Sequence, residues 1–116
     1  MPIPFKNNIE RLTLNNNNYR KVIYTTEQTQ LVLMSLLPSE DIPLEIHKKT
    51  TQFIRVESGT GICYINNERY NLKDGDAIVI PQNTKHYIKA TSELKLYTLY
   101  SPPEHDFDLI QKDQSN

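Results

Sequence analysis

The sequence has little of several features that mark other classes of protein. Its one cysteine, Cys63, has no partner in the chain for a disulfide, which agrees with a reducing compartment. The 13 Lys and Arg residues are balanced by 14 Asp and Glu residues, and a net charge of −1 gives no broad positive field to hold nucleic acid or an anionic membrane. No apolar run is long enough to span a membrane, and the first residues lack the apolar stretch of a signal peptide. We therefore expect a cytoplasmic protein that binds neither nucleic acid nor membrane.

The length of 116 residues suits a single domain with one apolar core. Residues 1–18 are polar and end in a tract of four asparagines, so we expect them to form a flexible or surface lead-in. The domain itself is expected at residues 19–100. Residues 101–116 are expected to form a C-terminal tail, in which 106–112 has the composition of a short helix.

Short runs rich in Val, Ile, Leu and Tyr follow one another between residues 19 and 100, and turn-forming residues separate them. They predict about nine strands, at residues 19–25, 30–36, 44–47, 52–57, 62–65, 69–72, 77–80, 86–90 and 94–100. Strands joined by such short turns pair antiparallel. No segment of this region has a sustained helical period, so the sequence predicts an all-β sandwich or barrel.

Four polar side chains in this pattern have the chemistry of metal ligands. Glu45 and His47 are two residues apart in a predicted strand, so both should point to the same face. Gln52 begins an otherwise apolar strand face, and His86 opens a strand directly after a turn set by Pro81. Two imidazoles, one carboxylate and one amide oxygen suit a first-row divalent ion such as zinc, iron, manganese or nickel, without choosing among them. Gln52 is expected either as the fourth ligand or as the partner of a metal-bound water.

The spacing of these residues resembles the first motif of the cupin family. That motif runs Gly, five residues, His-x-His, three or four residues, Glu, six residues, Gly. Here Glu45-Ile46-His47 is followed by four residues, Gln52, six residues and Gly59. Relative to the family, Glu45 stands for the first His and Gln52 for Glu.

The second cupin motif runs Gly, five residues, Pro-x-Gly, two residues, His, three residues, Asn. It is matched by Gly75, Pro81-Gln82-Asn83 and His86, with Asn83 in place of the last Gly and Ala90 in place of Asn. The resemblance implies an antiparallel double-stranded β-helix, the jelly-roll barrel of cupins. It also implies that Glu45, His47, Gln52 and His86 hold one divalent metal ion, in a mixed set similar to that of phosphomannose isomerases.

The exchange of ligand types keeps one carboxylate in the set, now at Glu45, so the formal ligand charge is that of the family. Glu45, His47 and His86 also form the combination of two histidines and one carboxylate that holds non-haem iron with open positions. We expect an enzyme acting on a small oxygen-rich metabolite, similar to a sugar or sugar-phosphate isomerase or to a non-haem iron oxygenase. The alternative is a non-catalytic module that binds or senses a small molecule such as a carbohydrate.

Four further expectations concern features outside the ligand set. His105 follows the rigid segment Ser101-Pro102-Pro103-Glu104, which either folds across the barrel mouth and makes His105 a proton donor or leaves it an exposed tail histidine. Cys63 is expected to be a small buried residue, because no base lies near it in sequence. A homodimer is expected, because small cupins commonly pair and the N-terminal strands would otherwise leave an exposed edge. Barrel-wall or interface positions are expected for Tyr64, Tyr70, Tyr97 and Tyr100.

Overall fold

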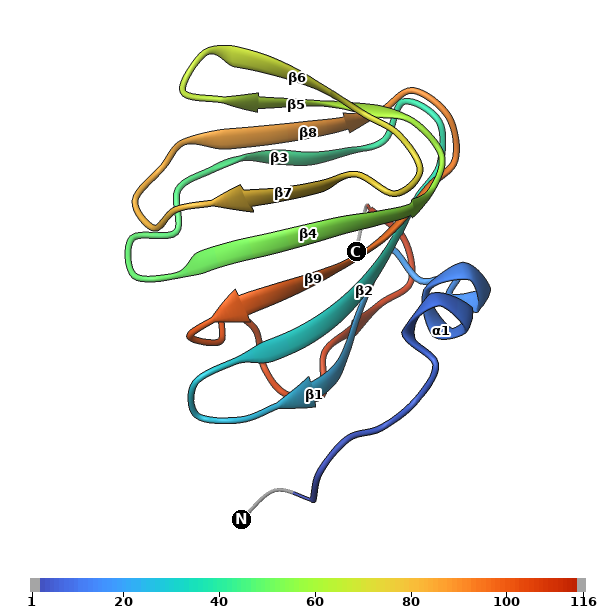
Figure 1. The fold of residues 1–116 in the computed structure, drawn as a ribbon, viewed down its shortest axis with the longest axis vertical. Coiled ribbons are helices and arrows are strands. Elements are labelled where there is room, and N and C mark those ends of the chain that lie inside the picture. Colours follow the sequence, from blue (N-terminus) through green and yellow to red (C-terminus); the bar gives the residue numbers. More distant parts are fainter. Residues whose placement is uncertain (1–2, 115–116) are drawn as a thin grey trace.

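The structure is a computed structural model that describes residues 3–114. One helix, α1 (Ile9–Asn15), precedes ten strands (Figure 1). The strands are β1 (Arg20–Thr25), β2 (Gln30–Leu36), β3 (Asp41–Glu45), β4 (Thr51–Ser58), β5 (Gly61–Ile65), β6 (Glu68–Leu72), β7 (Ala77–Ile80), β8 (His86–Ala90), β9 (Leu94–Ser101) and β10 (Ile110–Gln111).

The strands form two antiparallel sheets that face each other. One has six strands in the order β10-β1-β2-β9-β4-β7, and the other has four in the order β3-β8-β5-β6. In Figure 1 the four-stranded sheet lies above the six-stranded sheet. The predicted all-β jelly-roll fold is thereby confirmed. Within the described residues, no helix has the length and apolar character needed to cross a bilayer.

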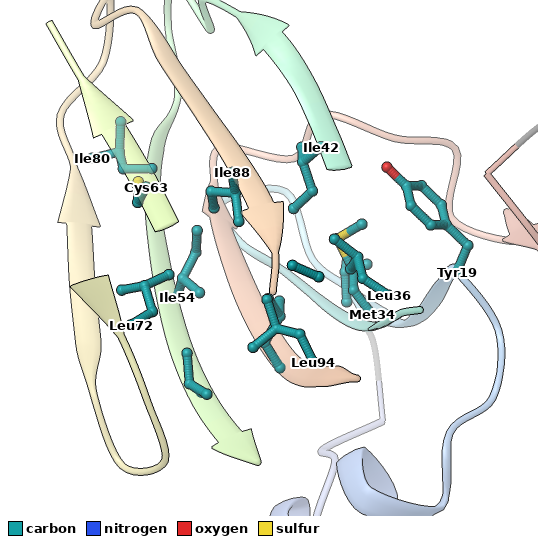
Figure 2. Close-up of a cluster of buried hydrophobic side chains, with 14 of the residues drawn as sticks. Tyr19, Met34, Leu36, Ile42, Ile54, Cys63, Leu72, Ile80, Ile88 and Leu94 are labelled. Atoms are coloured by element: carbon teal, nitrogen blue, oxygen red, sulfur yellow. The ribbon is translucent and has the colours of Figure 1, made fainter. Parts of the chain in front are cut away.

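The core lies between the sheets, and in β4 and β8 it comes from alternation along the strand. In β4, Ile54 and Val56 are buried while their neighbours are partly exposed, and in β8 the same holds for Ile88. Figure 2 shows these aliphatic side chains meeting between the two sheets. Because successive side chains of a strand point to opposite faces, the period of two in the sequence is enough to fill this core.

The barrel end opposite the metal-ligand candidates is closed by tight turns. Gly59 has a φ of 101°, and a Cβ there would lie 1.9 Å from the carbonyl oxygen of Glu93. Any side chain at Gly59 would therefore both strain the backbone and displace the β8–β9 turn. The last glycine of the first motif is thus explained by close packing at this end.

The two ends of the chain are more structured than the sequence suggested. The lead-in contains α1, whose N-cap Asn8 accepts from the backbone N–H of Arg11, and Asn16 of the asparagine tract is buried. The buried Lys95 Nζ donates to the carbonyl oxygen of Asn16 and, at 3.1 Å, to Asn17 Oδ1, which ties the tract to β9.

The helix expected at residues 106–112 is wrong. Residues 110 and 111 instead form β10, in which Gln111 pairs with Arg20 and Ile110 pairs with Lys21. The edge of β1 that was expected to be exposed is therefore covered by the same chain, and β7 is left as an edge of the six-stranded sheet.

Candidate metal centre

The four predicted ligands come from three segments that meet at one end of the barrel, on the left in Figure 1. Glu45 is the last residue of β3, Gln52 lies near the start of β4, and His86 is the first residue of β8. His47 lies just after β3, so the strand expected at 44–47 is displaced to Asp41–Glu45. Glu45 and His47 are nevertheless adjacent in space.

A bulge in β3 turns Glu45 toward the interior. Ile42 pairs with Ile88 and Glu45 pairs with His86, so three steps along β3 oppose two along β8. Without this extra residue, alternation would place Glu45 on the face opposite the buried Ile42. The bulge therefore brings the carboxylate onto the same face as the core and beside His86.

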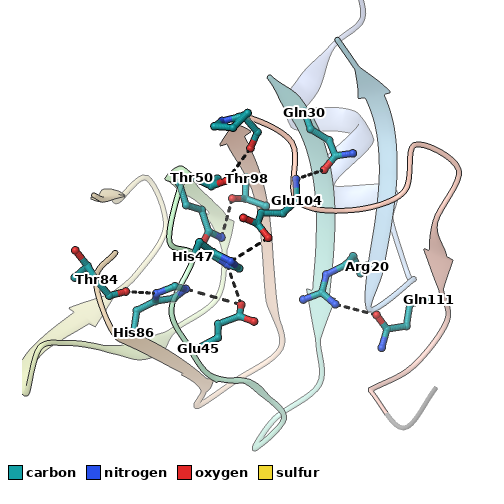
Figure 3. A network of polar contacts seen from close by, with 12 residues as sticks. Arg20, Gln30, Glu45, His47, Thr50, Thr84, His86, Thr98, Glu104 and Gln111 are labelled. Carbon is teal, nitrogen blue, oxygen red and sulfur yellow. Dashed lines mark hydrogen bonds and ion pairs between the residues drawn. The ribbon is translucent and has the colours of Figure 1, made fainter. Parts of the chain in front are cut away.

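Glu45, His47 and His86 have their ligand atoms within 4.8 Å of one another. Glu45 Oε1 lies 3.2 Å from His47 Nε2 and 3.8 Å from His86 Nε2 (Figure 3). The two imidazole rings are tilted at 47° with centroids 5.1 Å apart. This spacing agrees with three donors gathered about one ion at metal–ligand distances of about 2.0–2.2 Å.

Each histidine is held through its Nδ1 atom, which directs Nε2 inward. His86 Nδ1 lies 2.9 Å from the carbonyl oxygen of Thr84, and this oxygen only accepts, so the proton is on Nδ1. His47 Nδ1 lies 3.3 Å from Glu104 Oε2. Metal-binding histidines commonly donate one ring N–H to a carboxylate or carbonyl while the other nitrogen binds the ion.

The buried atoms without a hydrogen-bond partner within the described residues include His105 Nε2 and, on the predicted ligands, three more: His47 Nε2, His86 Nε2 and Gln52 Oε1. His47 Nε2 and Glu45 Oε1 lie 3.2 Å apart as an ion-pair contact, without a hydrogen bond between them. Buried polar atoms are nearly always paired, so this group calls for a specific explanation. All three are electron-pair donors of the kinds that bind divalent metals, and the residues present therefore fit a metal ion.

Gln52 is oriented by a neighbouring strand. Its Nε2 donates to Thr98 Oγ1 on β9 at 3.0 Å, which leaves Oε1 as the unpaired atom of the amide. The side chain is almost completely buried on the inner face of β4, as predicted. Its role as a fourth ligand or as the partner of a metal-bound water remains a prediction.

The charges at the site act on one another. Burial raises the pKa of Glu45, but His47 and His86 outweigh it and hold that pKa below its usual value. Glu45 raises the pKa of His47 above its usual value against the effect of burial, and Glu104 adds to the rise. The site therefore favours a charged carboxylate at Glu45, the form that binds a cation.

The sequence interpretation missed Glu104 and Gln30. Gln30 Oε1 accepts from the backbone N–H groups of Glu104 and His105 at 3.2 and 3.0 Å, and its Nε2 donates to the carbonyl oxygen of His105 at 2.7 Å. These three bonds hold the segment after β9 across the barrel end, where Glu104 reaches His47. The sequence contains a pattern that could have indicated Gln30. It is the first inward-facing residue of β2, as Gln52 is the first inward-facing residue of β4.

His105 lies in the segment that crosses the barrel end, and so is not an exposed tail residue. Its ring packs edge-on against Tyr100 with centroids 5.1 Å apart, while Tyr100 packs against His47 on another side. Burial, assisted by the charge of Arg20, lowers the pKa of His105 to about 4. The neutral ring is thus a packing element behind the site, and Glu104 is the residue of this segment that contacts a predicted ligand.

The remaining candidates lie in the core or on the surface of the barrel. Cys63 is buried in the core as expected, and burial raises the pKa of its thiol to about 11. Tyr64 and Tyr70 are exposed on the four-stranded sheet, whereas Tyr100 is completely buried.

Asn83 shows how the chain tolerates its departure from the second motif. It has a φ of 61°, in the left-handed region that Gly adopts freely and Asn adopts more readily than most residues. Its backbone N–H donates to the carbonyl oxygen of His47 at 2.7 Å. The turn before His86 thereby also fixes the backbone of the other histidine, so the two motifs are joined at this point.

Comparisons with known proteins agree with this geometry. Residues 32–100 match the cupin domain family, which is more than half of the chain. The chain belongs to the cupin family. Among curated proteins, this cupin is 40% identical over 124 residues to the uncharacterized protein YrkC of Bacillus subtilis, covering 99% of this chain and 66% of YrkC. It therefore spans just under two thirds of the length of that relative.

Two solved structures extend the comparison. The crystal structure of BH2720 from Bacillus halodurans superposes on this cupin with a TM-score of 0.96 at 36% identity, covering 98% of this chain and 92% of that one. KdgF from Halomonas sp. superposes with a TM-score of 0.71 at 25% identity, covering 75% and 80% of the two chains. The family and the fold are thus shown by both sequence and structure.

Proposed function

We propose that this cupin binds one divalent metal ion, zinc, iron, manganese or nickel, through Glu45, His47 and His86, and acts there on a small oxygen-rich metabolite. Gln52 is the fourth ligand or the partner of a metal-bound water. The observation that carries the proposal is the convergence of unpaired, buried donor atoms on the Glu45 carboxylate. An ion at this point would satisfy them together.

The chain's own residues would prepare the site in advance. Glu45 supplies the formal negative charge, and the two Nε2 atoms supply neutral lone pairs. Glu104 and the carbonyl oxygen of Thr84 hold the Nδ1 protons, which fixes both ring orientations. When bound, the metal would supply Lewis-acid polarisation of a substrate oxygen, as in a sugar or sugar-phosphate isomerase, or oxygen chemistry of the non-haem iron type.

The proposal favours an enzyme over a binding module because a second carboxylate stands next to the metal ligands. One carboxylate oxygen of Glu104 contacts His47 Nδ1, and the Glu104 side chain is partly exposed at the barrel end. A carboxylate so placed is suited to accept a proton from a bound substrate. The alternative, a non-catalytic carbohydrate-binding or sensing module, requires only the ligands and no such group.

The test is elemental analysis of protein purified without added metal, followed by a screen of phosphosugars and of oxygen uptake. We expect about one equivalent of metal in the natural protein and none in His47→Ala or His86→Ala, because each variant loses one of only two nitrogen donors. Absence of any first-row metal, together with unchanged stability on adding zinc, iron, manganese or nickel salts, would reject the metal site. A bound metal without turnover of any compound would favour the module.

We also propose that the protein is a homodimer, which pairs through the edge of β7. This strand ends the six-stranded sheet, and its Val79 is 55% exposed, so an apolar edge is available for strand pairing. Light scattering at micromolar concentration should give twice the chain mass, and Val79→Lys should give the monomer mass. A monomer mass for the natural protein would contradict the proposal. The cytoplasmic location stays a prediction from the sequence.

A further inference from the structure

Arg20 is a positively charged side chain that enters the barrel from β1. In the register of β1 with β2, Arg20 pairs with Met34 and Val22 pairs with Val32. Met34, Val22 and Val32 are all core residues, so Arg20 lies on the inner face of the sheet. The intervening Lys21 lies on the outer face. Arg20 is therefore placed among buried groups although it carries a full charge.

The guanidinium is held on one side and unpaired on the other. Nη1 donates to Gln111 Oε1 on β10 at 2.9 Å, and the group lies 5.4 Å from the centre of the Tyr19 ring. Nε is buried and has no acceptor, and no carboxylate of residues 3–114 lies within 4 Å of the guanidinium. With Nη1 occupied, the edge formed by Nε and Nη2 remains, which is one of the two-donor forks that bind oxyanions in a bidentate manner.

This charge acts on Glu45, one of the predicted ligands, and on His105. Burial has the largest effect on the pKa of both Glu45 and His105, and Arg20 lowers both values by its charge. In Figure 3 Arg20 is drawn between Gln111 and the group of Glu45 and Glu104, and its dashed line goes to Gln111 and to neither carboxylate. Arg20 is thus near enough to act on the site but is not used by the site residues.

A half-buried guanidinium with a buried, unpaired N–H is unfavourable unless an anion accepts a hydrogen bond from that N–H and balances the charge. We propose that Arg20 binds an oxyanion group, a carboxylate or a phosphate, of the metabolite that is handled at the metal centre. The inference rests on the proposed function and narrows it from an oxygen-rich to an anionic metabolite. Two fixed points, the metal ligands and Arg20, would hold a small molecule in one orientation.

The test uses inorganic phosphate, malonate and the neutral malonamide as probes, titrated into the ¹⁵N-labelled full chain. We expect phosphate or malonate to shift the Nε–H resonance of Arg20 and malonamide to leave it unchanged. Arg20→Gln should raise the dissociation constant of that anion on the order of tenfold or more, because a charge-assisted bidentate contact is lost. Arg20→Lys keeps the charge but not the fork and should restore only part of the affinity.

Lys21→Gln is the matched control, since it removes the same charge from the adjacent residue on the outer face. It should leave the affinity unchanged. Gln111→Ala removes the contact that positions Nη1 and should weaken anion binding less than Arg20→Gln does. The melting temperature of each variant separates a loss of binding from a loss of folding.

Each titration is run on metal-loaded protein and on protein treated with a chelator. If Arg20→Gln weakens anion binding in both forms, the Arg20 site stands even where the metal site fails. If neither phosphate nor malonate binds the natural protein, or if both bind Arg20→Gln as tightly as the natural protein, the inference is wrong. The anion that binds more tightly decides between a phosphate and a carboxylate group.

Discussion

The two halves of the barrel interior are built from the same strands but differ in how their buried atoms are satisfied. Along β8, His86, Ile88 and Ala90 all point inward and are at most 1% exposed. Ile88 and Ala90 need only packing, whereas His86 buries a nitrogen atom without a hydrogen-bond partner. The same change occurs along β4, from Val56 and Ile54 to Gln52.

The difference teaches that burial alone does not identify the site. The apolar half stabilises the fold by removing carbon surface from water. The polar half costs stability until its unpaired atoms acquire a partner. A bound metal ion should therefore stabilise the protein only through the polar half. Substitutions at polar and apolar positions of one strand can test this difference.

The largest effect is expected from comparing Ile88→Ala with His86→Ala. Ile88→Ala should lower the free energy of unfolding by about 2–5 kcal/mol, because it leaves a cavity in the core. It should still be stabilised by metal, by about 2.7 kcal/mol when the ion is present at about 100 times its dissociation constant. His86→Ala should lose that stabilisation. Denaturant unfolding with and without metal measures the free energy of unfolding and its increase on metal binding. If metal stabilises His86→Ala as much as it stabilises the natural protein, His86 is not a metal ligand.

The second comparison sets two ligands of different charge against each other. Glu45→Ala removes the formal negative charge of the set and should weaken metal binding by about 100-fold or more. Gln52→Ala removes a neutral amide and should weaken it by about tenfold. Calorimetric titration of metal gives the order. If Gln52→Ala abolishes binding while Glu45→Ala leaves it intact, the carboxylate is not the charged ligand and Glu45 is only a strand-surface acid.

A smaller effect is expected at Glu104, which contacts a ligand without being one of the predicted set. Glu104→Gln removes a charge that adds to the effect of Glu45 on the pKa of His47, and it weakens the contact that orients Nδ1, so metal affinity should fall by about tenfold. Glu93→Gln, an exposed position at the other barrel end, is the matched control and should change nothing. Equal affinities for the two variants would show that Glu104 does not orient His47.

The last comparison concerns a pH dependence of stability from His105. Its pKa is about 4 in the folded chain and 6.5 for an ordinary histidine, so acid favours proton uptake by the unfolded chain. The contribution is complete above pH 6.5 and is lost as the pH falls toward about 4. His47, whose pKa is raised, has the opposite slope, so the measurement is the difference in melting temperature between the natural protein and His105→Gln across this range. A difference that does not change with pH would contradict the buried neutral state of His105.

Several parts of the fold and site follow from the sequence because they depend on local patterns. Short apolar and aromatic runs bounded by turn-forming residues predicted β2, β7 and β8 with their observed bounds, since both signals are local to the segment. The two motifs predicted Glu45, His47, Gln52 and His86 as ligands, and the structure brings the ligand atoms of the two histidines and Glu45 together. The spacing of these residues along the sequence was sufficient to predict that their side chains meet.

What only the tertiary structure decided depends on contacts between distant segments. The bulge that turns Glu45 inward comes from the pairing of β3 with β8, and local alternation cannot show it. Glu104 reaches His47 because Gln30, 74 residues earlier, holds its backbone. Arg20 looks in the sequence like an ordinary strand residue, and its place on the inner face of the sheet follows from the register of β1 with β2 and from its contact with Gln111 on β10. Such contacts are fixed by the packing of the whole barrel, because each joins residues that no local period relates.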